Sequence, residues 1–571
     1  MATHHTPLHR AAAEAVAAHA GIAATDLKVE APPRPDLGDL AVGCFAIARA
    51  RKQNPAEVAR AIAAAFTPSK LLASATAAGP FVNFRADRTA AFRWLIDSAL
   101  RSRLLPRELG TGKTICIDYG SPNISKHLAY HHVRGTMIGH ALAQTFRALG
   151  YRVVGINFLG DWGTTHGMLL AAWARWGPIA PVDIEGLNKL YVRFRAAAKD
   201  DPALEQEGRD WFRRLEQGDP HARALWQQFR DVSWAEFHDV YEILGIEYDE
   251  VRGESAYEPD MPRIFQTLAA RGLIKDSQGA QVVELPGEDN PILLRTRDGT
   301  TLYATRDVAA AEYHWDSYHF TRSLYVVDRG QALHFRQLFK LLGVMGHAWS
   351  AHCEHIPYGL VRIDNQKSAT RLGNVVLMRD VFAIAEDMAR KVIEEVSPDM
   401  APDLVAQVAR KVGIGAIVFG NLAPQRDKDI DFDIDHAVSL EGDAGPYVQY
   451  SHARCASVAR KAGETIASID GIDLSLLSQD LEWAIARRLL DFPEIVVRSS
   501  EACEPHLICH YLLQLSADFA RWYTAGNTDK TLRMLSDDPA LRRARLALTA
   551  ATQVTLRDGL ALLGITAPDE M

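Results

Sequence analysis

Thr114–Asn123 has the sequence TICIDYGSPN, an apolar strand pattern that ends in turn residues. A helix-patterned run, HHVRGTMIGHALAQTFRALG, occupies His131–Gly150, and a second strand pattern, YRVVGINFLGDW, follows at Tyr151–Trp162. Strand, loop, helix and strand in this order predict a βαβ unit with a right-handed crossover. A parallel sheet of this kind binds its ligands at the carboxyl ends of its strands, where we expect the functional residues.

Patterns on both sides of this unit indicate a multidomain chain. The N-terminal part combines Ala-rich helical stretches with the strand-like GPFVNFRA at Gly79–Ala86, which predicts a small α+β domain. Strand patterns return at Leu324–Asp328 and His355–Ile363 after an insertion rich in Trp, Arg and Asp, and nearly all of the chain beyond has helical spacing. The expected domains are residues 1–108, residues 109–380 with the insertion at about 168–285, and residues 381–571.

The composition excludes several classes of protein. The 571 residues are 48% hydrophobic and 23% charged, as in an ordinary globular protein. The six cysteines form no CxxC pair, which argues against a disulfide scaffold or a zinc ribbon and fits a reducing cytoplasm. No apolar run reaches the roughly 18 residues that span a bilayer, so we expect no membrane contact. The net charge of −8 excludes a protein coated in positive charge, but not a local basic face for nucleic acid.

Three motifs in the chain could bind ligands. SPNISK at Ser121–Lys126 lies between a strand and a helix N-terminus, where backbone N–H groups and a lysine suit an anion. Tyr303 and Asp307 are one helical turn apart and could hold a cation, with the carboxylate paired to a guanidinium by two parallel hydrogen bonds. QKSATRLGNVV at Gln366–Val376 is a basic loop that could bind phosphates. Taken singly, each also fits a plain turn, a solvated helix start or a surface loop.

Taken in order along the chain, these motifs resemble the arginyl-tRNA synthetases, a family of class I aminoacyl-tRNA synthetases. The motifs that carry the resemblance are SPNISK, GDWGT, LYATRD, VVDRGQALHF, ATRLGN and GPYVQYSHAR. The resemblance covers essentially the whole chain. It implies a Rossmann-like parallel-sheet catalytic core, a small α+β N-terminal added domain and an all-α C-terminal anticodon-binding domain.

The resemblance also implies a two-step, ATP-dependent ligase reaction. The carboxylate of arginine attacks the α-phosphate of ATP to give arginyl-adenylate and pyrophosphate, and the arginyl group then passes to tRNA. The expected partners are arginine, ATP with Mg²⁺, and tRNA at the helical domain. The family is usually monomeric, and we expect no tightly bound metal.

The residues expected to bind arginine are all present. Asn123 matches the asparagine with which the family holds the amino acid, and Asp118 stands at the strand end, where the family carries an acid. Tyr303, Asp307 and Gln331 match the guanidinium pocket. The resemblance therefore implies an intact arginine site.

The first nucleotide-binding signature of the class, His-x-Gly-His, is altered. Without gaps it falls on Ala129, Tyr130, His131 and His132, so only the last histidine is kept. Glycine allows the backbone to approach the adenine, and His131 places a side chain in that space. The histidine replaced by Ala129 would donate to phosphate oxygens, and loss of one such donor costs roughly 100- to 1000-fold in rate. The similar Met-Ile-Gly-His at Met137–His140 lies within the helix pattern and is rejected.

The second signature is better preserved. The family's Lys-Met-Ser-Thr-Arg-Lys-Gly-Asn falls on Lys367–Asn374. Lys367, Arg371, Gly373 and Asn374 are kept, while the second lysine is Leu372. Many members of the family lack that lysine, and the lysine before the first signature, here Lys126, takes over its charge. The residues expected at the nucleotide are thus Lys126, His132, Lys367 and Arg371 as catalytic groups, and Ala129, His131 and Gly373 as the altered binding surface.

Two kinds of function remain open from the sequence. The first is an arginine–tRNA ligase that tolerates the altered signature. The second is a paralogue that keeps the arginine pocket but has a redirected or lost adenylation activity, either as a biosynthetic arginine-modifying enzyme or as a non-catalytic binder of arginine or tRNA. Ala129 and His131 favour the second kind, whereas the preserved pocket argues against simple decay.

Overall fold

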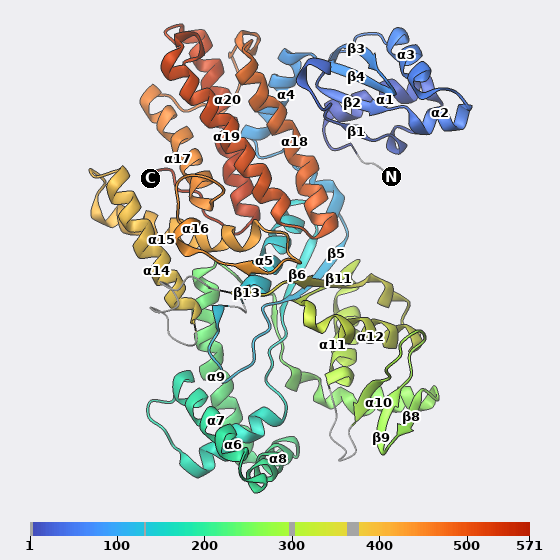
Figure 1. Ribbon diagram of the computed structural model, residues 1–571, viewed down its shortest axis with the longest axis vertical. Coiled ribbons are helices and arrows are strands. Elements are labelled where there is room, and N and C mark those ends of the chain that lie inside the picture. The colour runs from blue at the N-terminus through green and yellow to red at the C-terminus, as the bar shows by residue number, and fades with distance from the viewer. Residues whose placement is uncertain (1–3, 131–132, 296–302, 363–375) are drawn as a thin grey trace. The chain divides into compact units, whose positions relative to one another are not determined.

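The computed structural model (Figure 1) describes residues 4–130, 133–295, 303–362 and 376–571. The chain forms two compact units. The first, which contains the predicted βαβ unit, comprises residues 110–389 and 416–437, and the second comprises residues 1–109, 390–415 and 438–571.

A five-stranded parallel sheet is the centre of the first unit. Its strand order is β12-β11-β5-β6-β7. The strands are β5 (Thr114–Tyr119), β6 (Arg152–Asn157), β7 (Glu250–Val251), β11 (Arg322–Asp328) and β12 (Cys353–Tyr358). Helix α5 (Val133–Ala148) joins β5 to β6 and packs on β5, β6 and β11, as the βαβ prediction requires. From β5 the chain builds the sheet first towards β7 and later towards β12, so β5 and β11 flank the point where the strand order reverses.

Two long segments connect β6 to β7 and β7 to β11. Between β6 and β7 the chain forms four helices, α6 (Thr164–Trp176), α7 (Ile184–Ala198), α8 (Pro202–Glu216) and α9 (Pro220–Ile243). The last three begin at the aspartate caps Asp183, Asp201 and Asp219, which accept from backbone N–H groups of the first turn. After β7 come α10 (Met261–Ala270), an antiparallel sheet of β8 (Ile274–Ser277), β9 (Ala280–Val283) and β10 (Ile292–Arg295), and then α11 (Tyr303–Tyr318).

The remaining elements of the first unit follow β11 in the chain. Helix α12 (Ala332–Val344) joins β11 to β12, and β13 (Val361–Arg362) pairs with β14 (Ile430–Asp431). The short helix α16 (Ile434–Ala437) follows β14. Helices α14 (Met378–Val396) and α15 (Pro402–Leu422) each run from one unit into the other.

The second unit contains the α+β domain expected at the N-terminus, drawn blue in Figure 1, and a group of long helices drawn orange to red. Its antiparallel sheet has the order β1-β2-β4-β3, from β1 (Val29–Glu30), β2 (Leu40–Gly43), β3 (Leu72–Ala78) and β4 (Phe81–Ala86). The helices beside this sheet are α1 (Pro7–Ala20), α2 (Phe45–Arg51) and α3 (Pro55–Ala65).

The long helices of the second unit share one core. They are α17 (Gly445–Ala462), α18 (Asp480–Ala502), α19 (His506–Thr528) and α20 (Pro539–Leu562), and α4 (Arg88–Leu100) packs on α18 and α20. The buried Arg545 is satisfied by the Glu482 carboxylate and by the carbonyls of Arg533 and Thr531. This pairing is what allows two charges to lie within the helical core.

Candidate active site

A cavity of about 590 Å³ opens at the carboxyl ends of β5 and β11, where the strand order reverses. Its walls come from the loop after β5, the end of β11, helix α11 and the start of α12. The lining side chains used below are Asp118, Asn123, Glu254, Asp307, His314, Asp328, Gln331 and His334. A cavity at this point of an open parallel sheet is the expected ligand site.

The loop after β5 is fixed by its pairing with the loop after β6. Gly160 N–H donates to the Pro122 carbonyl (2.9 Å), and Ile124 N–H donates to the Gly160 carbonyl (3.1 Å). Gly160 also makes room for Asn123, because a Cβ at Gly160 would lie 2.3 Å from Asn123 Oδ1. The Ser121 hydroxyl donates to Asp118 Oδ1 (2.8 Å). These contacts hold Asp118 and Asn123 beside the same cavity.

The cavity is rich in carboxyl groups, and two of them are strongly perturbed. Burial raises the pKa of Asp118 to about 7, against the hydrogen bond from Ser121 that lowers it. Burial also raises the pKa of Glu254 to about 8, although Arg306 lies 3.8 Å from its carboxylate. A group of buried acids at a strand end suits a cationic ligand, because each would gain a partner for its charge.

Asp307 already has a partner on α12. Its Oδ2 lies 2.6 Å from His334 Nε2. Burial lowers the pKa of His334, but the bond to Asp307 raises it, and the net direction is upward. His334 therefore fixes the orientation of the Asp307 carboxylate beside the cavity.

Four of the five residues predicted to bind arginine line this one cavity: Asp118, Asn123, Asp307 and Gln331. Tyr303 is the first residue of α11, and its side chain lies outside the described part of the chain. Sequence reasoning did not identify Glu254, His314 or His334. The only available signal was for His334, which lies three residues after Gln331 in the motif VVDRGQALHF.

The predicted nucleotide site is only partly described. His131, His132, Lys367, Arg371 and Gly373 lie outside the described residues. The segment before them is well fixed: Tyr130 N–H donates to the Val376 carbonyl (3.0 Å), Met378 N–H donates to the Leu128 carbonyl (3.2 Å), and Ala129 bridges to Leu377. The first signature thus pairs with the chain that directly follows the second.

Lys126 and His127 face the insertion helices. Lys126 Nζ lies 5.6 Å from the ring centre of Tyr191 on α7. The two ring nitrogens of His127 contact Glu185 Oε2 on α7 (2.8 Å) and Glu236 Oε1 on α9 (2.9 Å). Two further histidines near this segment in the sequence, His140 and His166, are buried, and burial lowers the pKa of each to about 4.

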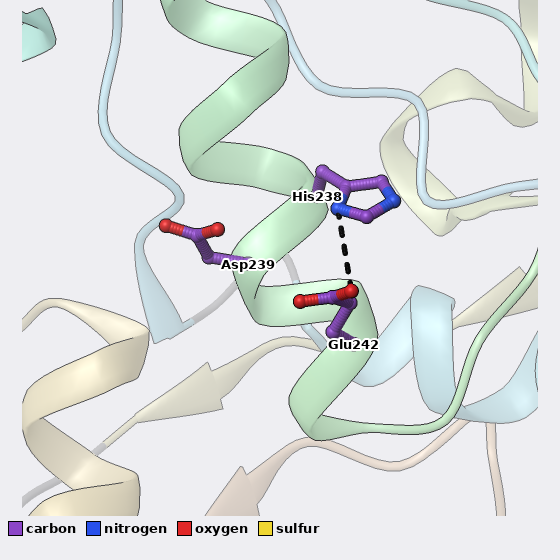
Figure 2. A group of neighbouring side chains, drawn as sticks. All are labelled: His238, Asp239 and Glu242. Atoms are coloured by element: carbon purple, nitrogen blue, oxygen red, sulfur yellow. Dashed lines mark ion pairs between the residues drawn. The ribbon is translucent and has the colours of Figure 1, made fainter.

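Among the described residues, one group of side chains has the spacing of metal ligands. His238, Asp239 and Glu242 project from one turn of α9, and all three are exposed (Figure 2). His238 and Glu242 form an ion pair of 4.0 Å. An exposed acidic turn of this kind is an ordinary solvated helix face, and it contains none of the residues predicted for the site.

No helix in the described part of the chain is long and apolar enough to cross a membrane.

The parallel sheet, with an acid-lined cavity where its strand order reverses, and the α+β domain and long helices of the second unit match the architecture that the resemblance to class I aminoacyl-tRNA synthetases implies. Three family models match the chain: the class I (R) tRNA synthetase catalytic domain over residues 96–434, the DALR anticodon-binding domain over residues 448–571, and the arginyl-tRNA synthetase N-terminal domain over residues 6–86.

Full-length relatives agree with the family models. The chain is 41% identical over 549 residues to an arginine–tRNA ligase of Exiguobacterium sibiricum, covering 95% of each, and 40% identical over 552 residues to that of Lactobacillus acidophilus, covering 95% of this chain and 96% of the relative. The arginyl-tRNA synthetase of Thermus thermophilus superposes with a TM-score of 0.82 at 27% identity, over 99% of this chain and 100% of that one. The chain belongs to the arginyl-tRNA synthetase family, a family of ligases. The predicted family and fold class are confirmed.

Proposed function

We propose that this chain is an arginine–tRNA ligase, which activates arginine with ATP and transfers the arginyl group to tRNA. The observation that carries this proposal is the cavity at the strand-order reversal, in which Asp118, Glu254 and Asp307 gather three carboxyl groups. Membership of the family favours this function over the arginine-modifying paralogue, because the similarity extends over nearly the whole length of the relatives.

Arginine enters this cavity with two cationic groups and one anionic group. Asp307, oriented by His334, pairs with the guanidinium, and Tyr303 and Gln331 complete its pocket. Asp118 attracts a cationic group of the substrate once it is ionised. Asn123, held beside Gly160, fixes the amino acid so that its carboxylate faces the ATP.

ATP enters as a substrate with Mg²⁺, as in the family. Lys126, His132, Lys367 and Arg371 neutralise the charge that develops on the phosphates when the arginine carboxylate attacks the α-phosphate. Ala129, His131 and Gly373 border the nucleotide. Mg²⁺ comes with the phosphates, and we expect no tightly bound metal in the protein itself.

The tRNA contacts the helical domain. A second cavity of about 530 Å³ lies within the second unit, between α17, α19, the segment 397–404 and the chain end. The guanidinium carbon of Arg454 lies 4.5 Å from the ring centre of Tyr450 and 4.9 Å from that of Tyr523. Aromatic faces beside a cation suit an unpaired base of the anticodon loop. The chain acts as a monomer, with residues 1–108 as the added domain, 109–380 as the catalytic domain and 381–571 as the anticodon-binding part.

Arginine-dependent ATP–pyrophosphate exchange, measured with and without tRNA, together with direct charging of tRNA, tests this function. We expect exchange that depends on tRNA, and charging with arginine. Exchange without charging would point to the redirected paralogue, and arginine binding with neither activity would point to a binder.

A further inference from the structure

His127 is bonded on both sides by carboxylates of the insertion. Its Nδ1 faces Glu236 of α9 and its Nε2 faces Glu185 of α7, at 2.9 and 2.8 Å, and the histidine side chain is only 8% exposed. An ionised carboxylate accepts hydrogen bonds and donates none, so both contacts are hydrogen bonds only when both ring nitrogens carry protons. In that form His127 is a cation between two anions on different helices.

The neighbours of His127 in the chain are attached to the same two helices. Ser125 N–H donates to the Ser233 hydroxyl of α9 (2.8 Å), and Ser233 in turn donates to the Phe229 carbonyl (2.6 Å). On the other side, Lys126 lies over Tyr191 of α7. The stretch Ser125–His127 is therefore held by α9 at two points and by α7 at two points, and His127 bonds to both helices.

We infer that His127 is a positioning residue for Lys126: it bridges α7 to α9 and so sets where the Lys126 ammonium stands relative to the phosphates. This inference rests on the proposed role of Lys126 at the phosphates. Without the bridge, Glu185 and Glu236 lose the cation between them, and of the two contacts between α7 and the loop described above only that of Lys126 with the Tyr191 ring is left. Glu185 then keeps its ion pair with Lys189 on its own helix (2.8 Å).

The first test compares His127→Gln with the wild type in arginine- and tRNA-dependent pyrophosphate exchange. Glutamine donates from one end only, so one carboxylate is left without its bond. We expect a roughly tenfold loss of kcat/KM for ATP, because small misplacements of a charge-stabilising group cost one to two orders of magnitude. The KM values for arginine and tRNA should stay unchanged. Glu185→Gln should shift kcat/KM for ATP in the same direction, and Glu185 is half-exposed, so this variant does not threaten folding.

His238→Gln is the matched control. His238 forms the same kind of His–Glu pair, lies on the same helix α9 and is exposed, and its partner Glu242 belongs to α9 itself (Figure 2). It should leave all kinetic constants unchanged. His127→Lys, which keeps a cation with several donors between the two carboxylates, should recover part of the loss.

A double-mutant cycle with Lys126→Met separates the inference from the proposed function on which it rests. If His127 acts through Lys126, the double variant should be no worse than Lys126→Met alone. Losses that multiply would show that His127 acts independently and would overturn the inference. An equal loss of kcat/KM for ATP, arginine and tRNA, together with a lower Tm, would also overturn the inference, because general destabilisation gives that result. A harmless Lys126→Met would refute the proposed role of Lys126 first, and the inference with it.

Discussion

Asp118 is the residue whose charge should govern arginine binding near neutral pH. Burial raises its pKa to about 7, so the carboxyl stays protonated below that value and becomes a carboxylate above it. Only the carboxylate attracts a cation. We therefore predict that kcat/KM for arginine is constant above about pH 8 and falls about tenfold per unit below pH 7, because this constant reports groups of the free enzyme. Pyrophosphate exchange measured from about pH 5.5 to 8.5 checks this.

Asp118→Asn should lower kcat/KM for arginine and remove the inflection near pH 7 from its pH profile. If the inflection persists in Asp118→Asn and disappears in Glu254→Gln, the titrating group is Glu254, whose pKa burial raises to about 8. The two variants thus decide between the two buried acids of the cavity.

His334 should matter for arginine through Asp307. We predict that His334→Asn raises the KM for arginine roughly tenfold, because a hydrogen bond to a charged group contributes about 1.5–3 kcal/mol and its loss frees the carboxylate to rotate. His347→Asn is the control: His347 bonds Glu312 of the same helix α11 at 2.9 Å, and neither residue lines the cavity. Equal effects of both variants on the KM would mean that α11 as a whole, rather than Asp307, had been disturbed.

At the scale of single residues, the site residues that lie at or just after the end of a predicted strand were predictable from the sequence. Asp118 lies at the carboxyl end of β5 and Asn123 follows that strand, and the topology of a parallel sheet places such residues at its ligand site. Glu254 was not predictable, because it follows a strand of only two residues, β7, in a stretch whose pattern is helical. The pKa of Asp118 was not predictable either, since it depends on burial by segments far away in the chain.

Among the elements, the loops after β5 and β6 should behave as one part. We predict that Gly160→Ala raises the KM for arginine at least tenfold, because the new methyl would lie 2.3 Å from Asn123 Oδ1 and push that side chain from the cavity. Gly343→Ala in α12 is the control, since its methyl would meet only Ser350 Oγ, at an ordinary 3.6 Å. An unchanged KM in Gly160→Ala would show that Asn123 does not hold the amino acid.

The βαβ unit was predictable from periodicity, because its strands and helix are adjacent in the chain. The pairing of Leu128–Tyr130 with Val376–Met378 was not, because it joins segments almost 250 residues apart and leaves no local pattern. The same is true of the Tyr130 hydroxyl, which accepts from Asn421 Nδ2 (2.8 Å). The alteration of the first signature was predictable from the sequence. The structure adds that its first two residues, Ala129 and Tyr130, pair with the chain just after the second signature.

At the scale of the whole molecule, the proposed function assigns the substrates to different units. The cavity proposed for arginine belongs to the first unit, whereas the Tyr450–Arg454–Tyr523 cavity belongs wholly to the second. We predict that Tyr523→Ala raises the KM for tRNA about tenfold, because stacking of one base on an aromatic ring contributes roughly 1–3 kcal/mol. The KM values for arginine and ATP, measured at saturating tRNA, should not change. Arg214→Gln is the control, since Arg214 also stacks on an aromatic ring, Trp211 at 4.1 Å, but on helix α8 of the other unit. A Tyr523→Ala enzyme with an unaltered KM for tRNA would place the anticodon elsewhere on the helical domain, and one with an altered KM for arginine would mean that the two units do not bind their substrates separately.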